Sequence, residues 1–85
     1  MDPHIVMGNI HIHRDGRDYD ISAAHIDRQA SAAGLRELRE RGFSGPFATN
    51  AGVYYLDTRD PDIAFARRDL LMMQRDGIGH ASFHN

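Results

Sequence analysis

Hydrophobic and polar residues alternate along the chain on both sides of the dipeptide Asp15-Gly16. Alternation of this kind is typical of β-strands that bury one face, and Asp-Gly is favoured in the two-residue type I′ turns of hairpins. The pattern therefore predicts an N-terminal β-hairpin whose register is set by the turn. The cross-strand pairs expected from that register are Arg14 with Arg17, His13 with Asp18, Ile12 with Tyr19, His11 with Asp20, and Ile10 with Ile21.

The same alternation divides the predicted hairpin into an apolar face and a polar face. Isoleucine and tyrosine side chains fill the apolar face, which comprises Ile10, Ile12, Tyr19 and Ile21. On the polar face, each of two imidazoles lies opposite a carboxylate and close enough to interact with it. The polar face comprises Asn9, His11, His13, Asp18, Asp20 and Ser22.

Residues 23–41 are predicted to be mostly helical, and Gly42 follows as the residue that ends the helix. A glycine such as Gly34 costs about 1 kcal/mol relative to alanine in a helix interior. We therefore expect either close packing of Gly34 against the sheet or a helix that begins only at Ala32. Three residues are alternative N-caps for this helix: Ser22, Asp27 and Ser31.

Shorter patterns predict the remaining elements. Turn-forming residues at 43–52 indicate a connecting loop, with a short strand at 47–49 as an alternative. Residues 53–56 are apolar on both faces, which is typical of a central strand. Asp60-Pro61-Asp62 predicts the start of a helix that ends near Asp76, before Gly77. The other expected strands are residues 4–13, broken near Gly8, residues 18–22 and residues 78–83.

The element order β-β-α-(β)-β-α-(β) predicts a single α+β domain over residues 1–85. Its expected architecture is a two-layer sandwich, opened by the N-terminal hairpin. In it, two helices cover one face of an antiparallel sheet of three to five strands. The side chains expected in its core are Ile5, Ile10, Ile12, Tyr19, Ile21, Leu35, Leu38, Val53, Tyr55, Ile63, Leu70 and Met73.

The composition excludes several kinds of chemistry. The chain contains no cysteine, so it has neither a disulfide framework nor a thiolate nucleophile or metal ligand. All ten of its basic residues are arginine, which excludes a Schiff-base lysine and a phosphate-loop lysine. The net charge of −2 and the pI near 6.3 provide no overall field that attracts nucleic acid or an anionic membrane.

The chain shows no targeting segment. Its first residues lack the basic start and the long apolar core of a signal peptide. No apolar stretch approaches the roughly 20 residues that a membrane helix needs. Together with the lack of cysteine, these features favour a protein of the reducing cytoplasm that does not interact with membranes.

The histidines of the predicted hairpin suggest metal binding or acid–base catalysis. A His-x-His pair on a strand is suited to zinc, and aspartates can complete the set. A His–Asp dyad is also part of a catalytic triad, but no serine lies in a nucleophile motif. The favoured alternative is a solvated face whose His–Asp pairs each contribute about 0.2–1 kcal/mol, with no catalytic residue and no cofactor. The candidate metal ligands are His11, His13, Asp18 and Asp20.

The second predicted helix carries a stronger functional signal. Apolar residues between Ile63 and Met73 are too many for one stripe, so Phe65 and Met72 point away from the core beside Arg68. Such residues form an exposed patch unless a partner covers them, and Phe, Met and Arg are enriched at interfaces. The alternative is that Phe65 folds under the loop at 43–52. The residues expected to contact a partner are Phe65, Arg67, Arg68, Met72, Phe47 and Asn50.

The arginines of the first predicted helix offer a nucleic-acid-binding alternative. Phosphate contacts would be made by Arg28, Arg36 and Arg39. Glu37 and Glu40 lie among these arginines and reduce the local positive potential. A mixed-charge surface is therefore favoured over one that follows a phosphate backbone.

These observations favour a small non-enzymatic protein–protein interaction module. The expected partner is another protein, a nucleoprotein complex, or a second copy of the chain in a homodimer. Small proteins of phages and mobile elements often have this profile and inhibit or regulate a host machine by direct contact, as anti-CRISPR and anti-restriction inhibitors do. The alternatives are an RNA- or DNA-binding module that uses the arginines, and a metal-dependent or acid–base enzyme built on the His–Asp face.

Overall fold

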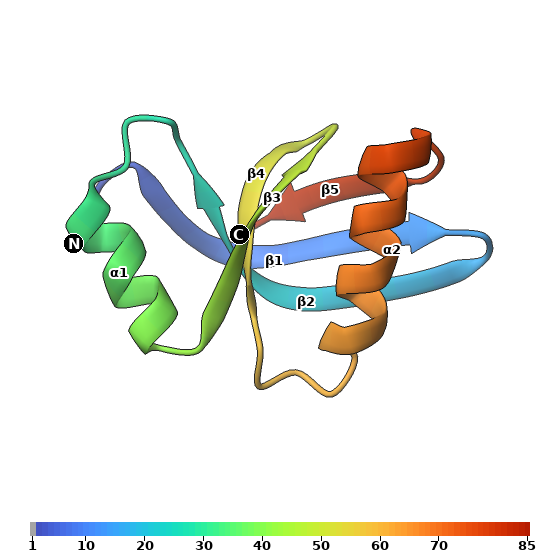
Figure 1. The fold of residues 1–85 in the computed structure, drawn as a ribbon, viewed down its shortest axis with the longest axis horizontal. Coiled ribbons are helices and arrows are strands. Elements are labelled where there is room, and N and C mark those ends of the chain that lie inside the picture. The colour runs from blue at the N-terminus through green and yellow to red at the C-terminus, as the bar shows by residue number, and fades with distance from the viewer. Residues whose placement is uncertain (1) are drawn as a thin grey trace.

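The computed structural model describes residues 2–85 as a five-stranded antiparallel sheet with two helices (Figure 1). The strands lie side by side in the order β3-β4-β2-β1-β5. This arrangement confirms the predicted α+β class and antiparallel sheet. The elements are β1 (Ile5–Arg14), β2 (Arg17–Ile26), α1 (Ala32–Glu40), β3 (Phe43–Thr49), β4 (Gly52–Asp57), α2 (Ile63–Asp76) and β5 (His80–His84).

The β1–β2 hairpin has the predicted register. Its pairs run from Arg14 opposite Arg17 to Ile10 opposite Ile21. Asp15 and Gly16 have φ angles of 51° and 78°, as a type I′ turn requires. The pairing then continues to the start of β1, so the predicted break near Gly8 was wrong.

Gly8 permits β5 to lie close to β1. A Cβ atom at Gly8 would lie 2.5 Å from the backbone oxygen of His84 and 2.6 Å from the ring of Phe83. A larger residue here would therefore displace the end of β5. The predicted C-terminal strand is thus present as β5, and the structure places it beside β1.

Residues 23–26 continue β2, so the prediction of a helix from Ala23 was wrong. This segment pairs with β1 on one side and with β4 on the other. Hydrogen bonding on both sides and complete burial of Ala23 and Ala24 outweigh the helical preference of alanine, which amounts to less than about 1 kcal/mol per residue. The helix α1 begins at Ala32, and the Ser31 hydroxyl accepts a hydrogen bond from the Gly34 amide. The latest of the three alternative N-caps is therefore confirmed.

The segment from Phe43 to Thr49 is an edge strand, so the prediction of a loop there was wrong. A bulge between Ser44 and Phe47 accommodates Pro46, which has no N–H to donate to the ladder. The neighbouring strand β4 lies between β3 and β2, which confirms its predicted central position. α2 also ends as predicted, although it begins at Ile63, with Asp62 rather than Asp60 at the N-cap.

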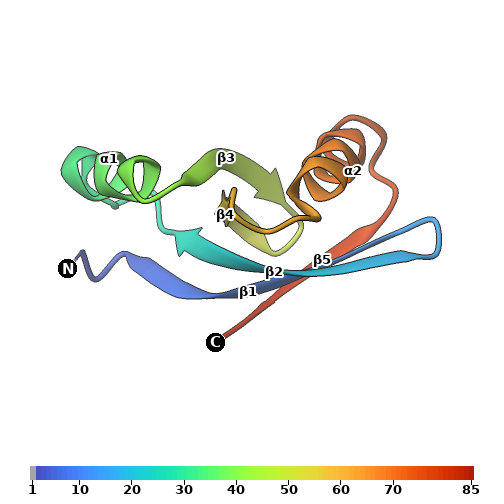
Figure 2. The ribbon, with the colours of Figure 1, turned by 90° about the horizontal axis from the view of Figure 1, so that it is seen from below.

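Two hydrophobic clusters lie on opposite faces of the strands. On β4, Tyr54 belongs to the cluster that includes Leu70 of α2, whereas Tyr55 belongs to the cluster that includes Leu38 of α1. Figure 2 nevertheless shows both helices on the same side of the β1–β2 ribbon. A long two-stranded ribbon twists strongly along its length. The face that packs against α1 at one end and the opposite face, which packs against α2 at the other end, therefore point to the same side of the molecule.

Most of the predicted core is buried, but four of its members are only partly so: Tyr19, Leu35, Val53 and Ile63. Several buried side chains were not anticipated from the sequence. They come mainly from the segments predicted as helix or loop, and include Ala23, Ala24, Ile26, Phe43 and Phe47. No helix between residues 2 and 85 is both long enough and apolar enough to cross a membrane.

Candidate functional site

The helix α2 is amphipathic, and its inner face packs on the sheet. The inner residues are Ala66, Asp69, Leu70 and Met73, all of them buried. At the end of the helix, the Gly77 amide donates a hydrogen bond to the Met73 carbonyl oxygen at 2.8 Å. Packing on one side and a closed C-terminus hold α2 in a defined position, so its outer side chains are presented on a rigid element.

The outer face of α2 combines exposed apolar side chains with arginines. Phe65 is 53% exposed and Leu71 is 54% exposed. The guanidinium carbon of Arg68 lies 5.7 Å from the centroid of the Phe65 ring, a cation–π contact. We call this face the α2 surface, and it consists of Phe65, Arg67, Arg68, Leu71 and Arg75. Ile78, just beyond the helix, is 57% exposed.

Of the contact residues that the sequence predicted on this helix, Phe65, Arg67 and Arg68 are exposed. Phe65 is exposed and does not fold under the segment at 43–52. Met72, in contrast, is partly buried, and Leu71 is exposed. Leu71 lies three residues after Arg68 and four residues before Arg75, so the three side chains share one side of the helix. Because two of the three are arginines, this spacing could have identified Leu71 as exposed.

Phe47 is not available to a partner, so its assignment as a contact residue was wrong. Its ring is buried in the cluster beneath α2, with the Arg67 guanidinium carbon 6.0 Å from its centroid. The error follows from reading residues 43–52 as a loop, because the bulged strand β3 directs this ring into the core.

Asn50 is exposed, but its amide binds β5. Asn50 Nδ2 donates to the Ala81 carbonyl oxygen at 3.3 Å, and Asn50 Oδ1 accepts from the Ala81 amide at 3.0 Å. These two bonds cover part of the open edge of β5. Asn50 also lines a hollow of about 410 Å³ together with Met73 and Gln74 of α2.

The carboxylates of α2 are paired with arginines of the hairpin and of the helix itself. Asp69 is fully buried, and both its oxygens accept hydrogen bonds at 3.1 Å from the Arg17 guanidinium. Asp76 accepts from Arg75 at 2.7 Å and from Arg14 at 3.5 Å, and Arg75 is the main cause of the lowered pKa of Asp76. Because Arg17 neutralises Asp69 and Arg75 is engaged with Asp76, the positive charge that remains on the α2 surface comes from Arg67 and Arg68.

The histidines of the hairpin surround one aspartate rather than forming separate pairs. His11 Nε2 and His13 Nδ1 each lie 2.9 Å from the same Asp18 oxygen. Asp20 is opposite His11 in the register, but its carboxylate lies 3.4 Å from His84 Nε2. In residues 2–85, no three His, Asp or Glu side chains are arranged to hold a metal ion. The four candidate metal ligands, which the sequence offered as an alternative to a solvated face, therefore do not come together in the described structure.

Replacing Asp18 by asparagine should destabilise the protein in a pH-dependent way. Hydrogen bonds from His13 and then His11 lower the pKa of Asp18 below its ordinary value of 3.8. The stability that the ionised carboxylate contributes is present above the unfolded pKa and is lost as the pH falls through the folded pKa. Chemical denaturation should show a difference between wild type and Asp18→Asn above about pH 5 that is lost progressively as the pH falls below about 4. The same difference at every pH would contradict this, and Glu40→Gln provides an exposed control.

The arginines of the nucleic-acid alternative do not act as one group. Arg39 donates a hydrogen bond to the Tyr55 hydroxyl at 3.0 Å, and its guanidinium lies over the same ring. Arg28 and Arg36 are exposed, one before α1 and one within it. One member of the set is therefore engaged in packing, and the others are separated along the chain.

The chain matches no protein-family model, no curated protein and no solved structure.

Proposed function

We propose that the protein is a non-enzymatic interaction module that binds another protein through the α2 surface. The observation that supports this most directly is the exposure of Phe65 and Leu71, each by more than half, on a helix whose other side is firmly packed. The role we propose is inhibition or regulation of a larger protein or nucleoprotein machine, of the kind that phages and mobile elements encode.

The chemistry of the α2 surface indicates the kind of partner that it fits. Aromatic and arginine side chains contribute most of the binding energy at many interfaces. Here Phe65 and Leu71 supply apolar contacts on the two sides of the outer face, and Arg67 and Arg68 supply positive charge between and beside them. The complementary surface is an apolar patch bordered by aspartate or glutamate residues.

The double substitution Phe65→Asp with Leu71→Asp tests this proposal. Both side chains are exposed, so the variant should fold normally but present carboxylates to an acidic partner. The partner is first identified by affinity capture from nuclease-treated host lysate and is then purified for calorimetry. We expect the variant to bind it at least about 100-fold more weakly, as loss of two central contacts implies.

Two surface controls separate the proposal from its alternatives. The double substitution Arg28→Asp with Arg36→Asp, at the other end of the molecule, should leave the affinity unchanged within about twofold. Unchanged affinity in the Phe65→Asp, Leu71→Asp variant would contradict the proposal. Capture that is lost after nuclease treatment would favour the nucleic-acid alternative. Concentration-dependent sedimentation that disappears in the α2 variant would identify a second copy of the chain as the partner.

A further inference from the structure

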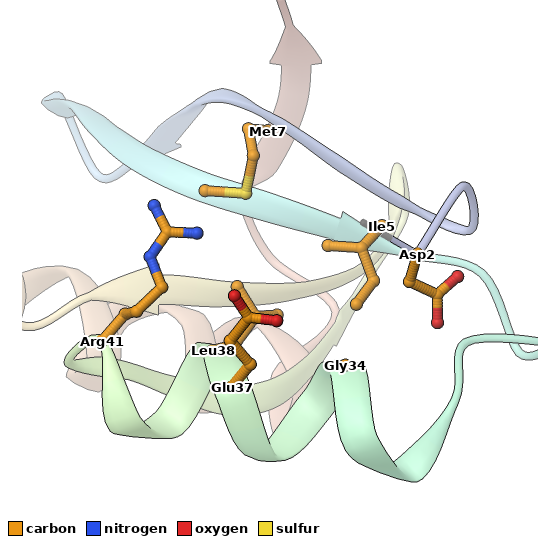
Figure 3. Close-up of a pocket in the computed structure, with 7 residues that line it drawn as sticks. All are labelled: Asp2, Ile5, Met7, Gly34, Glu37, Leu38 and Arg41. Carbon is orange, nitrogen blue, oxygen red and sulfur yellow. The ribbon is translucent and has the colours of Figure 1, made fainter.

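A small cavity lies between β1 and α1, at the opposite end of the molecule from α2 (Figures 1 and 3). Its volume is about 150 Å³. Ile5 and Met7 line it from β1, and Leu38 lines it from α1 (Figure 3). Ile5 and Leu38 are buried and Met7 is partly so, which makes the floor of the cavity apolar. A cavity of this size can hold a group about as large as benzene.

Gly34 keeps this cavity open on the side of α1. A Cβ atom there would lie 2.8 Å from Ile5 Cδ1 and 3.1 Å from Asp2 Oδ2. The Asp2 carboxylate is itself held in place, because it accepts hydrogen bonds from the amides of Ser31 at 2.6 Å and His4 at 2.8 Å. These bonds lower the pKa of Asp2, so this wall of the cavity carries a fixed negative charge.

The rim of the cavity carries two further charges of opposite sign. Glu37 and Arg41 are one helical turn apart and both exposed. Within residues 2–85, neither side chain forms an ion pair with the other or with a third residue. Figure 3 shows Arg41 at one end of the cavity, Asp2 at the other, and Glu37 between them. The cavity thus has one positive charge, that of Arg41, and two negative charges, those of Asp2 and Glu37, around an apolar floor.

We propose that this cavity binds a free α-amino acid with an aliphatic side chain. The carboxylate of the ligand would pair with Arg41, and its ammonium group would pair with Glu37 near Asp2. The aliphatic side chain would contact the floor of the cavity. A zwitterion is favoured because a purely anionic or purely cationic ligand would meet a like charge on the rim. The site is separate from the α2 surface and does not depend on the proposed function.

Titration with L-leucine, followed by NMR, tests this inference. We expect saturable shifts of the Met7 methyl group and the Gly34 amide, with a dissociation constant on the order of 1 mM for so small a ligand. Two analogues each lack one charge: 4-methylpentanoate has no ammonium group, and 3-methylbutylamine has no carboxylate. Each should bind at least about tenfold more weakly. Equal binding of leucine and both analogues, or no saturable shift up to about 20 mM leucine, would overturn the proposal.

Variants of α1 supply matched controls. Glu37→Gln and Arg41→Gln each remove one rim charge from an exposed side chain and should weaken leucine binding about tenfold. Glu40→Gln and Arg36→Gln change the same residue types on exposed positions outside the cavity and should leave binding unchanged. An equal effect of cavity and control variants would show that only the overall charge matters and would overturn the site. Full leucine binding by the Phe65→Asp, Leu71→Asp variant is expected whether or not the α2 surface binds a protein.

Discussion

Replacing Leu70 by alanine should lower the free energy of unfolding by about 2–5 kcal/mol, whereas replacing its neighbour Leu71 should change it by less than about 0.5 kcal/mol. Leu70 is fully buried in the cluster beneath α2, and Leu71 is exposed on the α2 surface. Truncation of Leu70 leaves a cavity between the helix and the sheet, which lowers stability beyond the loss of apolar burial. Urea unfolding of the two variants, followed by circular dichroism, measures both effects.

Comparison of the Leu70 and Leu71 variants also separates effects on folding from effects on partner binding. A domain of 85 residues has a stability of only about 5–15 kcal/mol, so Leu70→Ala should be close to the limit of stable folding. Leu71→Ala should remain as stable as wild type but bind the partner of the α2 surface more weakly. Equal losses of stability in the two variants would contradict the observed burial of α2.

Replacing Arg17 by alanine should be the most damaging substitution of an exposed charge. The carboxylate of Asp69 is fully buried, and Arg17 donates to both of its oxygens. A buried carboxylate that loses its cation destabilises a protein by about 3–5 kcal/mol. We expect the low end of this range, because Arg17 is itself 44% exposed and the Arg68 Nε atom lies 3.8 Å from the same carboxylate.

A double-mutant cycle measures this pair directly. Denaturant unfolding is compared for Arg17→Ala, Asp69→Leu and the variant that carries both substitutions. The double variant should be more stable than Arg17→Ala alone, since it removes the buried charge that the single substitution leaves without a partner. Arg36→Ala, on an exposed part of α1, is the control. A coupling energy near zero would show that Arg17 and Asp69 contribute independently.

Together these interactions explain why α2 can expose apolar residues on its outer face. Leu70 and Met73 bury the inner face against the sheet, and the Arg17–Asp69 pair connects the middle of the helix to the β1–β2 hairpin. Contacts on the inner face thus hold the helix without any contribution from Phe65 or Leu71, so these two side chains remain available to a partner.

Local signals were sufficient to predict the hairpin and α2. Asp15-Gly16 can adopt the two positive φ angles of a type I′ turn, and that turn alone sets every pair from Arg14–Arg17 to Ile10–Ile21. The helical period and Gly77 likewise place α2 and its exposed Phe65. In each case the interacting groups lie within a few residues of one another, so the chain near the element contains the necessary information.

Contacts between segments far apart in the sequence determined the features that were not predicted from the sequence. Ala23 and Ala24 are strand residues because β4, some thirty residues later, pairs with them, and Phe47 is buried because β3 forms the edge next to β4. Asp20 contacts His84 because β5 joins the sheet beside β1. The pattern of residues 20–26 and 43–49 is compatible with more than one local structure. Which structure these residues adopt depends on the strands that pair with them on either side. Hydrogen bonds and burial across the sheet outweigh the small local preferences of these residues.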